Sequence, residues 1–130
     1  MADSLLRPAQ QRSPRLAPAG LAAVRVLLFV LVAEHAFSLF TPPYGIGVPQ
    51  AFHLSFGLFY AWLAVKLFSG RPWTRVLVTV LLAIQFVGRF FVFAFIDNPW
   101  IRLLLIMGAV VTIVVVWMLW FVRPVRAFFR

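Results

Sequence analysis

An acid and a histidine stand side by side in the first long hydrophobic stretch of this sequence. Glu34 and His35 lie within residues 26–40, where every other residue except Ser38 is apolar. Ionisable groups are costly in hydrocarbon, so a carboxylate at this position is expected to pair with another group or to belong to a site. The first question for this sequence is therefore which side chain could partner Glu34.

The candidate partner is Arg89, in the third hydrophobic stretch. At the rise of an α-helix, Glu34 lies about 9 Å and Arg89 about 10 Å from the outer ends of their predicted helices. Because the two charges fall at one depth, the sequence predicts an intramembrane ion pair or ligand site. Gln85 is one turn from Arg89 and Ser38 is one turn from Glu34, so both are expected to belong to it.

Further polar residues fall in the same half of the predicted bundle. His35, His53, Arg102 and Asp97 are expected to form an outer-half polar cluster, with Arg102 and Asp97 at its rim. Adjacent residues point about 100° apart on a helix, so Glu34 and His35 cannot easily share a metal ion. We therefore predict no metal site, no cofactor and no catalytic residues.

Three interpretations of this polar cluster remain open on the sequence. The first is a structural Glu34–Arg89 pair that fixes the helix register, because polar side chains commonly hold membrane helices together. The second is a binding site for an external ligand, a lipid headgroup or a partner helix. The third makes Glu34 a proton-coupled carboxylate in a small transporter.

The composition places these residues in a membrane protein. Of the 130 residues, 64% are hydrophobic and only 12% are charged, whereas a soluble domain has roughly 25% charged residues. A small soluble fold could not bury this much apolar surface, so the bilayer must be the solvent for most of the chain. The absence of cysteine excludes disulfides, thiolate metal sites and cysteine nucleophiles.

The hydrophobic stretches predict an all-α fold, with four transmembrane helices in an up-down bundle. Membrane strands are excluded because each stretch is about twice the length that a strand needs. Residues 1–20 are expected to form a flexible, basic, Pro-rich tail, and residues 123–130 a short basic tail. The domain between them, 21–122, is predicted to contain helices at about 21–40, 50–68, 75–96 and 100–122.

The distribution of cations predicts how the bundle is oriented. The chain has a net charge of +9, and ten of its twelve Lys and Arg residues lie in the N-terminal segment through Arg25, in residues 66–75 or in the C-terminal tail. Residues 41–49 contain none. The positive-inside rule then places both termini in the cytoplasm. Lipid headgroups, rather than nucleic acid, are the expected anionic partners. The predominance of Arg over Lys suggests a GC-rich bacterial genome, so a bacterial inner membrane is the expected location.

No catalytic arrangement is apparent. The sequence has no Ser-His-Asp spacing and no glycine-rich phosphate loop. We therefore expect a non-catalytic integral membrane protein, an accessory or stabilising subunit that packs against a larger membrane protein or self-associates. The alternative is a small homo-oligomeric transporter or lipid flippase that uses Glu34 as its coupling carboxylate.

Overall fold

The structure, a computed structural model, describes residues 17–40 and 47–130. These residues are almost entirely helical, and no strand occurs among them. Four of the helices are long and apolar enough to cross a membrane. The predicted all-α class with four such helices is confirmed. The predicted flexible tail at residues 1–20 lies mostly outside the described residues, as does most of the first predicted loop.

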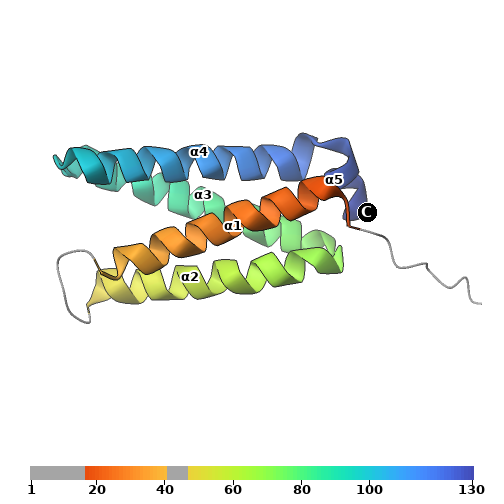
Figure 1. Cartoon of the computed structure of the whole chain (residues 1–130), viewed down its shortest axis with the longest axis horizontal. Helices are drawn as coiled ribbons and strands as arrows, with labels where there is room; N and C mark the ends of the chain where they lie inside the picture. Colours follow the sequence, from red (N-terminus) through yellow and green to blue (C-terminus); the bar gives the residue numbers. More distant parts are fainter. Residues whose placement is uncertain (1–16, 41–46) are drawn as a thin grey trace, which may run out of the picture.

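The elements follow one another along the chain with short connections. In order they are α1 (Ala19–Ser38), α2 (Val48–Lys66), the 3-10 turn η1 (Leu67–Ser69), α3 (Pro72–Phe95), α4 (Pro99–Phe121) and α5 (Arg123–Phe128). Each long helix begins and ends within three residues of the predicted boundaries. Figure 1 shows the four long helices lying side by side, with consecutive helices running in opposite directions.

Proline sets most of the helix starts. The helices α2, α3, α4 and α5 all have a proline in their first turn, where its missing N–H is not needed and its fixed φ suits a helix. The side chain of Asn98 also caps α4, because its Oδ1 accepts from the backbone N–H groups of Trp100 at 3.0 Å and Ile101 at 3.4 Å. Because Pro72 stands in the first turn of α3, this helix starts at Pro72, earlier than the predicted position near residue 75.

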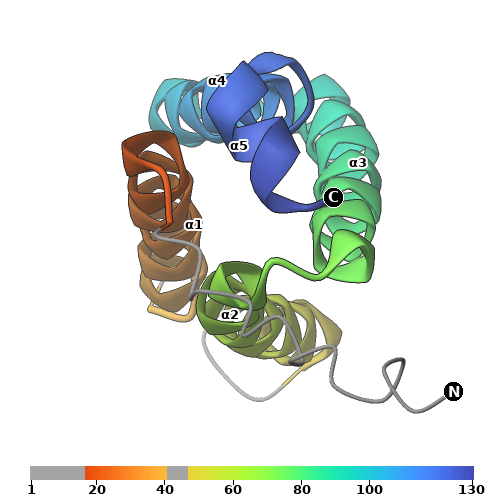
Figure 2. The same ribbon diagram turned by 90° about the vertical axis from the view of Figure 1, so that its right-hand side faces the viewer.

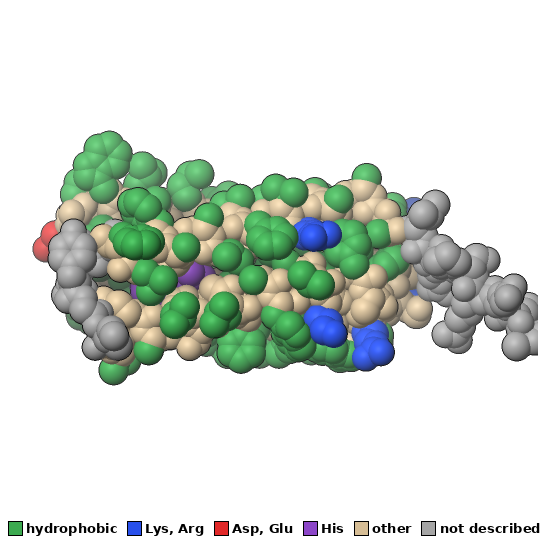
Figure 3. All heavy atoms as spheres, turned by 60° about the horizontal axis from the view of Figure 1, so that its bottom comes forward, with side chains coloured by type: hydrophobic (Ala, Val, Ile, Leu, Met, Phe, Trp, Pro, Cys, Tyr) green, Lys and Arg blue, Asp and Glu red, His purple; other side chains and the backbone are tan. Residues whose placement is uncertain are grey.

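The two ends of the bundle differ in charge, and we name them accordingly. The basic end contains the start of α1, the connection between α2 and α3, and α5; the Asp97 end contains the connection between α3 and α4 (Figure 1). Seen along the bundle, α1 to α4 surround a common axis and α5 lies across the basic end (Figure 2). The space-filling view shows a largely apolar face, with Lys and Arg only in the half toward the basic end (Figure 3).

The segment expected as a short basic tail instead begins with the helix α5. Val125 and Phe129 are buried, at 0% and 2% exposure, so α5 closes the basic end of the bundle. A Cβ at Gly20 in α1 would lie 2.8 Å from Cγ2 of Val125, which shows how closely α5 approaches α1. Gly70 has φ +66°, the left-handed conformation that suits glycine, and α5 packs against it through Phe128.

The apolar core occupies only one part of the bundle. Hydrophobic residues with no exposed surface end at Leu31 in α1 and at Leu82 in α3, and they begin at Tyr60 in α2 and at Val115 in α4. All of them therefore lie toward the basic end. Within the described ranges, the Asp97 end contains no buried hydrophobic side chain.

Candidate functional site

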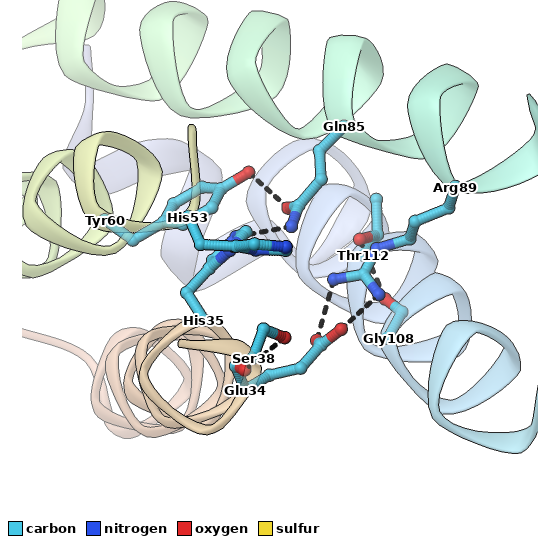
Figure 4. Close-up of polar contacts among 9 residues, drawn as sticks. All are labelled: Glu34, His35, Ser38, His53, Tyr60, Gln85, Arg89, Gly108 and Thr112. Atoms are coloured by element: carbon cyan, nitrogen blue, oxygen red, sulfur yellow. Dashed lines mark hydrogen bonds and ion pairs between the residues drawn. The ribbon is translucent and has the colours of Figure 1, made fainter. Parts of the chain in front are cut away.

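Glu34 of α1 and Arg89 of α3 form an ion pair inside the bundle. Nη2 of Arg89 donates to Oε2 of Glu34 at 2.7 Å, and Nη1 donates to Oε1, so the carboxylate is held by both arms of the guanidinium (Figure 4). The side chains are 7% and 21% exposed for Arg89 and Glu34 respectively. A paired geometry of this kind is needed when both charges leave water.

The fourth long helix provides the space for this guanidinium. A Cβ on Gly108 of α4 would overlap Nη1, Cζ and Nη2 of Arg89, so any side chain at this position would displace the guanidinium from its present place. One turn further along α4, the hydroxyl of Thr112 donates to the carbonyl oxygen of Gly108 at 2.9 Å. The ion pair thus depends on α1, α3 and α4 together.

A second polar group, which we call the polar chain, consists of Tyr60, Gln85, His35 and His53. The Tyr60 hydroxyl donates to Oε1 of Gln85 at 2.6 Å. Nε2 of Gln85 lies 2.6 Å from Nε2 of His35, and Nδ1 of His35 lies 3.0 Å from Nδ1 of His53 (Figure 4). Tyr60, Gln85 and His35 are at most 4% exposed, so this chain connects α2, α3 and α1 in the interior.

The hydrogen bonds of the polar chain have a direction. Because the Gln85 amide oxygen accepts from Tyr60, its nitrogen must donate to Nε2 of His35. A neutral His35 then carries its proton on Nδ1 and donates to Nδ1 of His53. His53 in turn carries its proton on Nε2, which has no partner among the residues the structure describes.

A cavity of about 350 Å³ adjoins both polar groups. It lies between the four long helices in the part of the bundle that has no buried apolar core. Its polar lining residues are Glu34, His35, Ser38, His53, Gln85 and Arg89. Its other lining residues are Phe37, Pro49, Phe52, Gly88, Val92, Ile96, Ile101, Leu104 and Leu105. The cavity therefore combines a polar wall with an apolar remainder, as small-molecule sites usually do.

The structure brings six of the eight predicted site residues to this cavity and leaves two apart. Ser38 donates through its hydroxyl to the backbone oxygen of Glu34 at 2.9 Å. Arg102 and Asp97 instead pair with each other at the end of the bundle, at 3.2 Å, with side chains 39% and 103% exposed. The nitrogen Nε of Arg102 donates to the backbone oxygen of Ile96 at 2.6 Å. This rim pair helps to join α3 to α4.

Sequence reasoning missed the roles of Tyr60 and Gly108. Tyr60 is the only tyrosine within a predicted membrane helix, and a buried tyrosine hydroxyl usually needs a hydrogen-bond partner, so it could have been expected to join the polar group. The role of Gly108 depends on the position of the Arg89 side chain, for which the sequence contains no signal.

The cavity wall has the features of a small-molecule binding site. Among the described residues, no group of three or more His, Cys, Asp or Glu side chains could hold a metal ion. The Glu34 carboxylate is engaged by Arg89, and no serine or threonine hydroxyl contacts either histidine within the described ranges. A cavity with fixed hydrogen-bonding groups can select and hold a small molecule.

Comparison with known proteins identifies no relative of this chain: no family model matches, and no curated protein or solved structure is detectably similar.

Proposed function

We propose that this chain is a non-catalytic integral membrane protein that binds a small molecule in the cavity beside Glu34 and Arg89. The observation that carries the proposal is the cavity itself, which lies inside a four-helix bundle and adjoins six polar side chains. In a bundle made only to anchor or stabilise, apolar side chains would be expected to fill this space, as they do toward the basic end.

The polar groups favour binding over translocation. From His53 the polar chain runs inward and ends at Tyr60. Beyond Tyr60 the bundle interior consists of fully buried residues such as Leu63, Val78 and Leu119. A transporter or flippase that uses Glu34 as its coupling carboxylate would need a path through this apolar packing, so we place it second.

Binding is compatible with the accessory or stabilising role expected from the sequence, because a small subunit can hold a ligand for a larger membrane complex. We also propose that both termini are cytoplasmic, so that the cavity lies in the outer half of a bacterial inner membrane. The support is the concentration of Lys and Arg at the basic end.

The proposal is tested by filling the cavity without changing its polar groups. Gly88 lines the cavity and a Cβ there would meet no atom within 4 Å, so Gly88→Leu should fit and occupy the space. Ala94→Leu on the same helix is the matched control, since Ala94 is exposed and does not line the cavity. Each variant would be extracted from native membranes into lipid nanodiscs, and the retained small molecules identified by mass spectrometry.

We expect the native chain and Ala94→Leu to retain one molecule per chain that Gly88→Leu has lost. Equal retention by all three proteins would contradict a binding role for this cavity. A larger membrane protein that copurifies in fixed proportion would in addition support the accessory role.

A further inference from the structure

We propose that the ligand of this cavity is an uncharged, largely apolar molecule with a carbonyl oxygen that accepts a hydrogen bond from Nε2–H of His53. This inference rests on the proposed binding function and specifies the chemical class of the ligand. It follows from which polar groups of the cavity are already engaged and which one remains available.

Most polar groups of the cavity wall are occupied by one another. Glu34 and Arg89 form their two-armed pair. Gln85 has Tyr60 on one side and His35 on the other, and both ring nitrogens of His35 are engaged. Nε of Arg89 has no hydrogen-bond partner among the described residues, but this atom has almost no accessible surface, so a ligand in the cavity does not reach it. These side chains therefore support the site rather than bind the ligand.

His53 has the one unpaired ring nitrogen of this wall within the described part of the chain. Its Nδ1 accepts from His35, which leaves Nε2–H as a donor on a half-buried side chain that lines the cavity. The direction of the polar chain, which starts at the Tyr60 hydroxyl, fixes this tautomer. Hydrogen bonds in such a chain polarise one another, which strengthens the terminal donor.

The charge balance of the wall favours a neutral ligand. The charges of Glu34 and Arg89 cancel, and the polar chain is uncharged in the protonation scheme above. A charged ligand would lose its hydration without meeting an unpaired opposite charge, which is costly. The rest of the lining, including Phe37, Phe52 and Leu104, is apolar and suits a hydrocarbon body.

The tautomers can be measured directly by 15N NMR on the full chain with labelled histidine, in detergent or nanodiscs. The chain has only two histidines, so the spectrum contains two pairs of ring nitrogens, and His53→Phe assigns them. We expect His35 to carry its proton on Nδ1 and His53 on Nε2. The reverse pattern, with His35 protonated on Nε2, would overturn the inference, because His53 would then present a lone pair and require a donor ligand.

The ligand class is tested with two probes of the same length, undecan-2-one labelled with 13C at its carbonyl and undecane. We expect undecan-2-one to raise the melting temperature more than undecane does, and its carbonyl infrared band to shift to lower frequency than in lipid alone. His53→Phe should weaken ketone binding by about tenfold, the effect of one hydrogen bond, and remove the band shift.

The outcomes separate this inference from the proposed function. If both probes stabilise the protein equally and Gly88→Leu abolishes both effects, the cavity binds apolar molecules but the carbonyl inference is wrong. If neither probe stabilises the native chain and Gly88→Leu changes nothing, the binding function itself fails. If His53→Phe does not fold, His53→Gln supplies the assignment, so the NMR experiment still decides the direction of the polar chain.

Discussion

The two halves of this bundle use the same four helices in different ways. Toward the basic end, which we call the closed half, side chains such as Leu28, Leu63 and Val115 have no exposed surface, and α5 covers the end. Toward the Asp97 end, the open half, the same helices enclose a cavity of about 350 Å³. The border between them is formed by the polar chain and the Glu34–Arg89 pair.

The buried face of α3 shows which residues produce the change from apolar packing to a polar border. The buried residues of α3 are Thr74, Val78, Leu82, Gln85 and Arg89, which are spaced by three or four residues and form one face. This face is mostly apolar in the closed half and becomes polar at the border. Dry packing thus stabilises one half, while the polar border supports the wall of the other.

The cations of the border and of the closed half have different kinds of partner. At the border, the guanidinium of Arg89 is paired with a carboxylate. In the closed half, the guanidinium of Arg75 lies over the ring of Trp120, at 4.1 Å from its centroid, and Nε1 of Trp120 donates to the hydroxyl of Thr79 at 2.9 Å. Aromatic packing therefore takes the place of an acid near the basic end.

The largest effect is expected from breaking the border pair. Arg89→Leu leaves the Glu34 carboxylate without its partner in the interior, and we expect a loss of about 3–5 kcal/mol in the free energy of unfolding. Glu34→Gln combined with Arg89→Leu should recover much of this loss, because no unpaired charge remains. Unfolding of the purified proteins in detergent measures both values.

The two single variants and the double variant form a thermodynamic cycle. A coupling energy near zero, with the losses simply additive, would contradict a border held together by this ion pair.

A smaller loss of stability is expected when a leucine is replaced by alanine, and its size should differ between the two halves. Leu82 is fully buried in the closed half, whereas Leu104 lines the cavity and is 42% exposed. We expect Leu82→Ala to cost about 2–3 kcal/mol, because it leaves a void in dry packing, and Leu104→Ala to cost about 0.5 kcal/mol or less. Equal losses in unfolding experiments would indicate that the open half is packed as tightly as the closed half.

The smallest effect concerns two glycines that differ in their surroundings. In Gly108→Ala the new methyl group would overlap the Arg89 guanidinium, and we expect a loss of about 1–3 kcal/mol. In Gly88→Ala nothing lies within 4 Å of the new methyl group, so the higher helix propensity of alanine should leave stability unchanged or raise it by about 1 kcal/mol. Thermal unfolding of the two variants measures this difference, and the same sign for both would refute the tight fit around Arg89.

Much of the fold could be predicted from the sequence because a segment that crosses hydrocarbon must be apolar, long enough to span it and hydrogen-bonded within itself. Apolar stretches of membrane length, broken by Pro and Gly, fixed the number of helices. The common depth of Glu34 and Arg89 also indicated their pairing, which depends only on helix ends and rise. Helix rotation is less visible in the sequence, since apolar residues surround each helix, so the burial of His35 inside the bundle could not be predicted.

The features that the sequence analysis did not anticipate depend on packing between helices. The hydrogen bond from Tyr60 to Gln85 requires the relative rotation of α2 and α3, and the space at Gly108 requires the Arg89 rotamer. The helix α5 follows Pro124, which begins a helix as readily as it ends one, and the basic residues around it suggested a solvated tail. The burial of Val125 and Phe129 shows that this segment packs against the bundle.

The most direct test of the difference between the halves is chemical access to single cysteines, because the chain has no cysteine of its own. Gly88→Cys would line the cavity, Val78→Cys would lie in the closed half, and Val87→Cys would lie on the exposed surface of α3. A small, uncharged methanethiosulfonate reagent would be applied to each variant in nanodiscs, with labelling followed by mass spectrometry. The reagent reacts with the thiolate, which does not form on a thiol that faces hydrocarbon or lies in dry packing. We predict that Gly88→Cys is labelled while Val78→Cys and Val87→Cys are not. A Gly88→Cys variant as unreactive as Val78→Cys would contradict an open half that admits a ligand.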